Sequence, residues 1–247
     1  MSFREEIKKE RQFGYWSIIP SVQTHEIMAL AGFDFCIIDL EHGTYSFQEA
    51  LESVISIQAS GMRALIRPSS HDEKEILRCL EIGVDGICIP HVRNKMEAEK
   101  IIDACTYPPS GIRGASGFTR ASNYGEKIFS DHVKSQDENI YISLLIESEE
   151  GLKNIIDISK IPRLDGLYFG TYDIASSCGL SNQNSDKVNQ LIDEAIKNID
   201  SENISFGQVF VNNEQFTNIN KNINFLVAGV DCGIILHGAN KARSGFK

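Results

Sequence analysis

The sequence lacks a long apolar run. No window approaches the roughly 18 continuous apolar residues that a membrane-spanning helix needs. Residues 1–16, MSFREEIKKERQFGYW, are charged and have no apolar core of the kind found in a signal peptide. We therefore expect a cytoplasmic protein that does not bind membranes.

Positive charge is also scarce. The 247 residues include 24 Lys and Arg against 34 Asp and Glu, which gives a formal net charge of −10. Because nucleic acids and anionic membranes attract basic surfaces, this balance argues against both as partners. Small molecules are the expected partners.

Closely spaced cysteine pairs are absent as well. The sequence contains no C-x-x-C motif, so we expect no zinc site of that spacing. Two cysteines stand inside apolar runs, where a thiol behaves as a small core hydrophobe. These two are Cys36 and Cys88, and the others are Cys79, Cys105, Cys178 and Cys232.

The chain does have eight short apolar runs, and 42% of its residues are apolar. The runs are apolar at nearly every position instead of alternating, which is typical of parallel strands covered on both faces. We therefore expect strands at residues 13–19, 35–40, 63–68, 86–92, 141–147, 166–171, 206–212 and 225–231.

Segments between these runs have the i, i+3, i+4 apolar spacing of helices, with polar residues that can cap their N-termini, at 46–60, 71–83, 94–106 and 185–200. Eight strand–helix units in a chain of this length predict an α/β fold, a (β/α)8 TIM barrel forming a single domain over 1–247, because a doubly wound sheet usually has fewer strands. The Gly- and Pro-containing stretch around 106–125 predicts a long rim loop between the fourth and fifth strands.

Ionisable residues follow several of the expected strands. In TIM barrels the catalytic groups stand at the C-terminal ends of the strands, so these residues should converge on one mouth. They are Asp39, Glu41, His42, Arg67, His91, Arg93, Glu147 and Asp173.

Glu147 and Asp173 follow neighbouring strands and together would offer an oxygen-rich site for a hard divalent ion. Another interpretation is that Glu147 is one of several solvated acids and that Asp173 caps a helix beginning at Ile174. Arg67 could hold a carboxylate or neutralise a developing enolate oxygen, or it could simply pair with Asp39 or Glu41.

His42 directly follows an acid pair, which suits a general base, although a histidine at a strand end can also be structural. His91 is a second candidate for the base or for a substrate contact. The other histidines considered, His25, His71, His132 and His237, are expected at the surface or at helix caps.

The motifs IIDLEHG, LIRPS, YPPSGIRG, IES and GTYDIA, in this order and at these separations, resemble the HpcH/HpaI aldolase/citrate lyase family of class II pyruvate aldolases. The likeness runs from about Trp16 to the last strand. It implies metal-dependent cleavage or formation of a 4-hydroxy-2-oxo acid through a pyruvate enolate, with a 2-oxo acid and an aldehyde as partners. It also implies a homo-oligomer, commonly a hexamer.

The resemblance further implies roles for individual residues. Glu147 and Asp173 would ligate Mg2+, Mn2+ or Co2+, and Arg67 would stabilise the enolate. His42 would act through a metal-bound water as the base on the C4 hydroxyl. Asp39 would be a structural partner of the mouth, and Glu81 stands where the family has an Asp that makes the histidine more basic.

Three positions depart from the family pattern. Leu145 replaces a Gln that contacts pyruvate, and Thr171 and Tyr172 alter a G-P-x-D turn that receives the substrate carboxylate. We expect Tyr172, with Arg67 and Asp173, to contact substrate. A related lyase or transferase acting on a sugar acid or phosphoenolpyruvate derivative, and a non-catalytic acid-binding barrel, both stay open. Two further residues, Arg113 and Arg120, would either contact an acidic acceptor or stabilise their loop.

Overall fold

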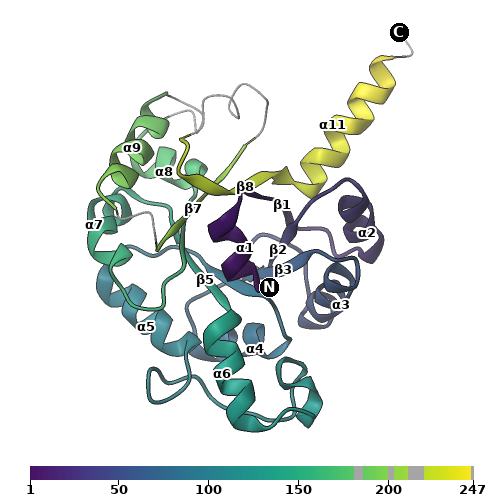
Figure 1. Ribbon diagram of the computed structural model, residues 1–247. Coiled ribbons are helices and arrows are strands. Elements are labelled where there is room, and N and C mark those ends of the chain that lie inside the picture. Colours follow the sequence, from purple (N-terminus) through teal and green to yellow (C-terminus); the bar gives the residue numbers. More distant parts are fainter. Residues whose placement is uncertain (181–185, 200–202, 211–219, 246–247) are drawn as a thin grey trace.

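The structure is a computed structural model that describes residues 1–180, 186–199, 203–210 and 220–245. Its eight strands form a closed parallel barrel in the order β1 to β8, which confirms the predicted TIM barrel (Figure 1). Residues 211 and 212 of the expected seventh strand lie outside the described residues. The strands are β1 Gln12–Ser17, β2 Phe35–Asp39, β3 Arg63–Arg67, β4 Gly86–Ile89, β5 Tyr141–Ile146, β6 Gly166–Phe169, β7 Ser205–Val209 and β8 Ile223–Val230.

Helices surround the barrel, and polar residues begin several of them. Ser46 and Glu49 form a capping box at the start of α3, and the Asp72 carboxylate caps α4. The helices are α1 Phe3–Lys9, α2 Val22–Leu30, α3 Phe47–Ala59, α4 Glu73–Glu81, α5 Lys95–Cys105, η1 Arg120–Gly125, α6 Phe129–Asn139, α7 Glu149–Ser159, α8 Thr171–Ser177, α9 Asp186–Lys197 and α11 Asp231–Ser244.

The strands are buried on both faces, as their continuous apolar runs predict. One set of side chains, which includes Ile37, Leu65 and Leu145, fills the inside of the barrel. A second set, which includes Ile38, Ile66 and Ile146, packs between the sheet and the helices. Neighbouring residues of one strand thus face opposite sides, so the side chain two positions after Ile37, Leu65 or Leu145 points back into the barrel axis.

Helix α1 closes the end of the barrel at which the strands begin (Figure 1). Phe3 belongs to the inner core, and its ring centroid lies 5.4 Å from that of Phe35 and 5.1 Å from that of Tyr141. Phe35 and Tyr141 are the first residues of β2 and β5. The opposite end, where the strands finish, is therefore left as the mouth.

The segment after α5 lies away from this mouth, whereas α11 begins beside it, directly after β8. Residues 106–125 follow the end of α5, and Arg120 donates hydrogen bonds to the carbonyls of Ile82 and Gly83, just after α4, on the side where strands begin. Helix α11 projects from the barrel into the surroundings (Figure 1). Among the described residues, no helix is both long and apolar enough to span a membrane.

Candidate functional site

Three charged side chains reach the barrel mouth because of strand alternation. Asp39, Arg67 and Glu147 each stand two residues beyond a side chain of the inner core, on β2, β3 and just after β5. All three are almost fully buried, with exposed fractions of 2%, 8% and 6%. The mouth is therefore a charged layer lying directly on the apolar filling of the barrel.

Arg67 is the centre of this layer. Its Nε donates to Asp39 Oδ1 at 2.9 Å, and its NH1 lies 3.2 Å from Glu41 Oε2 and 4.0 Å from Glu147 Oε1. The guanidinium carbon lies 4.4 Å from the centroid of the Trp16 ring. Burial by itself lowers the pKa of Arg67, but the hydrogen bonds and charge of Asp39, together with the charges of Glu41 and Glu147, outweigh it and raise the pKa overall. Arg67 is held as a cation among acids.

Asp39 is a structural partner, as expected. Besides Arg67, it accepts hydrogen bonds from the backbone N–H groups of Glu41 and His42, at 3.0 and 3.2 Å from Oδ1. It thereby fixes the turn that carries His42. The His42 side chain itself is exposed, and no described residue forms a hydrogen bond with its imidazole.

Glu147 is not one of the solvated acids of its segment, so that alternative is wrong. Its Oε2 accepts a hydrogen bond from the His91 N–H at 2.9 Å. Burial raises its pKa, and the nearby Asp173 charge acts in the same direction, while His91 and Arg67 oppose the rise. A Cβ added to Gly170 would lie 2.6 Å from Glu147 Cγ, so the side chain rests against the end of β6.

His91 lies at the mouth between two carboxylates. Its Nε2 donates to Glu41 Oε1 at 2.8 Å, and its Nδ1 lies 3.0 Å from Glu147 Oε2. Its φ of +55° is unusual for a residue other than glycine. The sequence identified His91 only as a second candidate, because the left-handed backbone conformation after β4 could not be predicted from the sequence.

Asp173 is exposed and is the third residue of α8, which begins at Thr171 and not at Ile174. Gly170 occupies the cap position without a side-chain cap, so the expectation that Asp173 caps the helix is wrong. Tyr172 is 60% exposed, whereas Thr171 is buried and its hydroxyl has no hydrogen-bond partner among the described residues. The altered turn therefore presents an aromatic ring and a carboxylate outward.

Glu81 is not brought to the mouth, which corrects its expected pairing with His42 within this chain. It is the last residue of α4, and a helix that returns from a strand end finishes where the next strand begins. There Glu81 Oε1 lies 3.7 Å from Arg113 NH2. The two residues are held at opposite ends of the barrel.

Asp231, the last residue of the expected eighth strand, was not among the predicted site residues. It is fully buried, and its Oδ2 accepts hydrogen bonds from Ser17 Oγ at 2.9 Å and from the N–H groups of Ile18 and Ile19 at 3.1 Å. It therefore ties the loop after β1 to the end of β8. The signal was present, since an acid at a strand end is the same pattern that identified Asp39.

Several other predicted residues lie outside the mouth. Arg113 is buried over the Tyr107 ring, and both it and Arg120 stabilise their own segment. Arg93 pairs with Glu97 on α5.

His25 and His132 were expected at the surface but are fully buried, and each forms a hydrogen bond with a tyrosine hydroxyl.

The donor set of the mouth fits a hard divalent cation. Glu147 and Asp173 supply carboxylate oxygens, whereas both oxygens of Asp39 accept hydrogen bonds from Arg67, the one guanidinium of the mouth in the described part of the chain. No group of three or more His, Cys, Asp or Glu residues arranged to hold a metal occurs in residues 1–180, 186–199, 203–210 and 220–245. The two carboxylates of Glu147 and Asp173 would leave other positions open for water and substrate.

Comparison with known proteins adds independent information. The model of the family HpcH/HpaI aldolase/citrate lyase matches residues 12–237. Pyruvate aldolase from Rhizobium etli is 30% identical over 238 residues, covering 95% of this chain and 92% of that protein. Hydroxypyruvate/pyruvate aldolase from Sagittula stellata is 33% identical over 174 residues, covering 70% of this chain and 68% of that protein.

Solved structures with the same fold are also found. A solved HpcH/HpaI aldolase/citrate lyase family protein from Burkholderia cenocepacia has a TM-score of 0.90 at 20% identity, covering 98% of each chain. The family match spans nearly the whole chain, and the sequence relatives named above are aldolases. The chain therefore belongs to the HpcH/HpaI aldolase/citrate lyase family and is an enzyme of the aldehyde-lyase type.

Proposed function

We propose that the protein is a divalent-metal-dependent carbon–carbon lyase that cleaves or forms a 4-hydroxy-2-oxo acid through a pyruvate enolate. Its partners would be a 2-oxo acid and an aldehyde, and it would act in the cytoplasm. The observation that carries the proposal is the convergence of Arg67 and Glu147 in one buried charged layer, 4.0 Å apart. A buried cation beside carboxylates that can hold a metal suits an anionic substrate with a developing enolate.

Glu147 and Asp173 would hold Mg2+, Mn2+ or Co2+, which when bound supplies Lewis-acid stabilisation of negative charge. The citrate lyase beta subunit from M. tuberculosis, a structure with a TM-score of 0.56 and 12% identity to this chain, is complexed with oxaloacetate and magnesium. The oxygen donors of the mouth are of the type that these ions prefer.

Arg67 would bind the anionic oxygens of the 2-oxo acid. Asp39 binds one edge of the Arg67 guanidinium, so NH1 is directed toward Glu41 and Glu147. The guanidinium is thereby preorganised to bind an anion. Below it, Trp16 and Leu145 form an apolar floor. This floor excludes water beneath the substrate and strengthens the electrostatic interactions above it.

His42 would be the general base. Its turn is fixed by Asp39, and its exposed imidazole is available to a substrate entering the mouth. It would take the proton from the C4 hydroxyl, whose electrons then form the aldehyde carbonyl as the C3–C4 bond breaks. The pair from that bond passes into the pyruvate enolate, which Arg67 helps to stabilise.

The test follows the methyl protons of pyruvate by NMR in D2O with Mg2+, Mn2+ or Co2+. We expect wild-type protein to exchange them for deuterium and Glu147→Gln to lose most of that rate. Glu149→Gln is the matched control, because Glu149 is exposed and pairs with Lys153 outside the mouth. Absence of exchange with every metal would reject the pyruvate enolate mechanism and favour a non-catalytic acid-binding barrel.

A second candidate is a related lyase or transferase with a changed substrate, such as a sugar acid or phosphoenolpyruvate derivative. Leu145 favours it, because this 1% exposed side chain of the inner core offers no polar contact beside the ligand. If pyruvate is the substrate, Leu145→Gln should tighten its binding. Unchanged or weaker pyruvate binding, together with tighter binding of phosphoenolpyruvate by wild-type protein, would favour the second candidate.

We also propose a homo-oligomer, with a hexamer as the family likeness suggests. The projecting helix α11 supports association, since its Ile235 and Leu236 are 50% and 63% exposed. Sedimentation equilibrium of the full chain measures the assembly, and a monomer at micromolar concentration would contradict it.

A further inference from the structure

Tyr168 brings a hydroxyl group to the apolar floor of the mouth. It belongs to the inner core and is the register partner of Leu145, which forms part of that floor. Tyr168 and Leu145 stand two residues before Gly170 and Glu147, so both side chains point into the barrel at the level below the charged layer. The phenol therefore lies directly under the candidate site.

Two contacts relate Tyr168 to the charged layer. Trp16 Nε1 donates to the Tyr168 hydroxyl at 3.0 Å, and the guanidinium carbon of Arg67 lies 4.4 Å from the centroid of the same tryptophan ring. Gly170, two residues after Tyr168, has no side chain, and Glu147 Cγ and Oε1 would lie 2.6 and 2.8 Å from a Cβ there. Tyr168 thus lies under the two side chains that would bind the substrate and its metal.

The Tyr168 hydroxyl accepts a hydrogen bond but donates none within the described residues. Its one hydrogen-bond partner in this part of the chain is the Trp16 indole. Because an indole N–H can only donate, no described residue accepts the phenol proton. Tyr168 is 3% exposed, and burial raises its pKa, so the proton stays on the oxygen at neutral pH. A buried donor of this kind is costly unless an acceptor binds to it.

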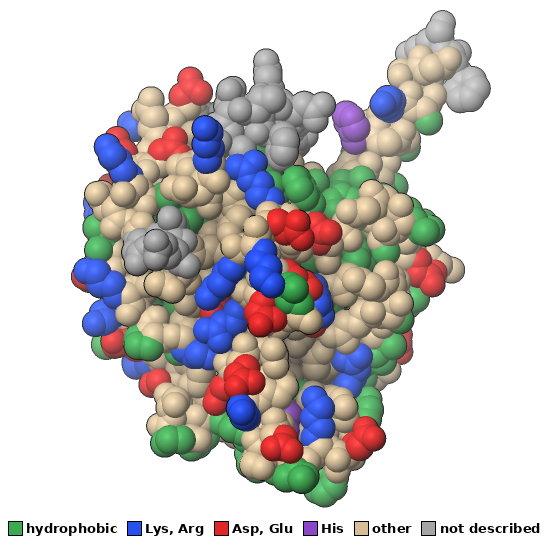
Figure 2. Space-filling model, in the orientation of Figure 1, with side chains coloured by type: hydrophobic (Ala, Val, Ile, Leu, Met, Phe, Trp, Pro, Cys, Tyr) green, Lys and Arg blue, Asp and Glu red, His purple; other side chains and the backbone are tan. Residues whose placement is uncertain are grey.

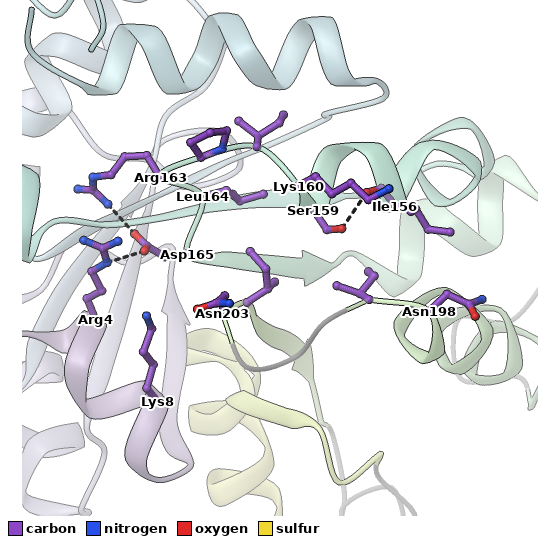
Figure 3. A pocket seen from close by; sticks show the side chains of 14 residues that line it. Arg4, Lys8, Ile156, Ser159, Lys160, Arg163, Leu164, Asp165, Asn198 and Asn203 are labelled. Carbon is purple, nitrogen blue, oxygen red and sulfur yellow. Dashed lines mark hydrogen bonds and ion pairs between the residues drawn. The ribbon is translucent and has the colours of Figure 1, made fainter. Parts of the chain in front are cut away.

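Tyr141, the other tyrosine of the inner core, has its hydrogen bonds complete. Its hydroxyl lies 2.5 Å from Ser205 Oγ, which itself donates to the Asp165 carbonyl, so the Tyr141 proton is directed to Ser205. The Asp165 carboxylate is bound by Arg4 and Arg163 at the end of the barrel where the strands begin (Figure 3). Figure 2 shows that end covered by charged side chains of both signs. Tyr141 is therefore a buried phenol remote from the mouth.

We propose that the Tyr168 hydroxyl donates a hydrogen bond to an oxygen of the bound 2-oxo acid and is, with Arg67, a residue that determines which acids bind. This inference rests on the proposed function. A 2-oxo acid presents only acceptors, its carboxylate and keto oxygens, and the Trp16 N–H is already engaged. A ligand with an apolar group over Tyr168 leaves the phenol proton unpaired, so the floor selects against it.

Isothermal titration calorimetry of the full chain with pyruvate, at saturating Mn2+, tests this contact. Tyr168→Phe removes only the hydroxyl and should weaken pyruvate binding about tenfold, as the loss of one hydrogen bond to a charged oxygen predicts. Mn2+ affinity, measured without pyruvate, should stay the same. Tyr141→Phe is the matched control, because it removes a buried hydroxyl from the same core and should leave both affinities unaltered.

A rescue experiment distinguishes contact with the ligand from support of Trp16. Leu145→Gln places an amide donor at the register partner of Tyr168. In the Tyr168→Phe background this second change should restore most of the pyruvate affinity if the lost hydroxyl bound the ligand. A hydroxyl that only positions Trp16 cannot be replaced in this way, so a double variant as weak as Tyr168→Phe would overturn the proposal.

The remaining outcomes separate this inference from the proposed function. Equal pyruvate affinities of the wild-type and Tyr168→Phe proteins overturn the Tyr168 contact and leave the proposed function standing. An equal loss in the Tyr168→Phe and Tyr141→Phe proteins also overturns the contact, because it reports a disturbed core. Absence of pyruvate binding by the wild-type protein is a different result, since it rejects the proposed function and the Tyr168 contact together.

Discussion

His91 contacts the same oxygen of Glu147 twice. Its backbone N–H donates to Oε2 at 2.9 Å, and its Nδ1 lies 3.0 Å from that oxygen. This is possible because the φ of +55° turns the chain back over the mouth directly after β4. Since Nε2 also reaches Glu41, His91 fixes the spacing between the two acids. It is thus a positioning residue for the proposed metal ligand.

Replacing His91 with Asn tests this role. Asn tolerates the left-handed conformation, so the backbone contact should persist while the imidazole contacts are lost. We expect Mn2+ binding to weaken about three- to tenfold, a modest effect because the His91 side chain is 54% exposed. Electron paramagnetic resonance of free Mn2+ measures the affinity. Arg93→Gln, a change outside the mouth, should leave it unaltered, and equal losses in both variants would contradict the role.

His25 should make the protein less stable in mild acid. It is fully buried, with Nδ1 2.8 Å from the Tyr15 hydroxyl, and burial lowers its pKa from 6.5 to about 4. Above pH 6.5 the His25 imidazole is neutral in both the folded and the unfolded state, so it does not change how the free energy of unfolding depends on pH. As pH falls from 6.5 to 4, the unfolded chain gains the proton and the folded one does not. This residue should then lower the free energy of unfolding by at most about 3 kcal/mol.

Urea denaturation at several pH values between 7 and 4 measures this contribution. His25→Gln cannot gain a proton, so its free energy of unfolding should decline less steeply than that of wild-type protein, whatever its value at pH 7. The exposed His237 provides the control variant His237→Gln, which should keep the wild-type slope. Parallel slopes for the His25→Gln and wild-type proteins would mean that His25 is protonated in the fold.

The sequence predicts the barrel well because one signal repeats eight times. Each strand is an unbroken apolar run, and the structure buries it on both faces, as for Ile37 and Ile38 of β2. Charged residues directly after the runs locate the mouth for the same geometric reason. Asp39, Arg67 and Glu147 can therefore be placed there without coordinates.

Side chains whose position depends on tertiary packing could not be placed in this way. Glu81 lies at the opposite end because it finishes a helix, and His25 and His132 are buried by neighbours distant in sequence. His91 reaches Glu147 only through a left-handed turn. The sequence pattern predicts strands and helices from their periodicity, but it does not predict which residues a side chain contacts across the barrel.

Gly170 should be essential for the position of Glu147. A Cβ at this residue would lie 2.6 Å from Glu147 Cγ and 2.8 Å from Oε1, closer than van der Waals contact allows. Gly170→Ala should therefore push the carboxylate out of place and reduce deuterium exchange into pyruvate at least tenfold. Gly117→Ala is the control, since its Cβ would meet nothing within 4 Å. Full exchange by the Gly170→Ala protein would show that Glu147 can move without loss of function.

His42→Ala should separate catalysis from metal binding. The imidazole is exposed and has no hydrogen-bond partner among the described residues, while its backbone is held by Asp39 through the main chain. Removing it therefore leaves Arg67 and Glu147 in place and takes away only the base. Cleavage of a 4-hydroxy-2-oxo acid, followed as pyruvate release, should fall about 10²- to 10⁴-fold, with Mn2+ affinity changed less than threefold. A parallel loss of both would show that His42 organises the site instead of moving the proton.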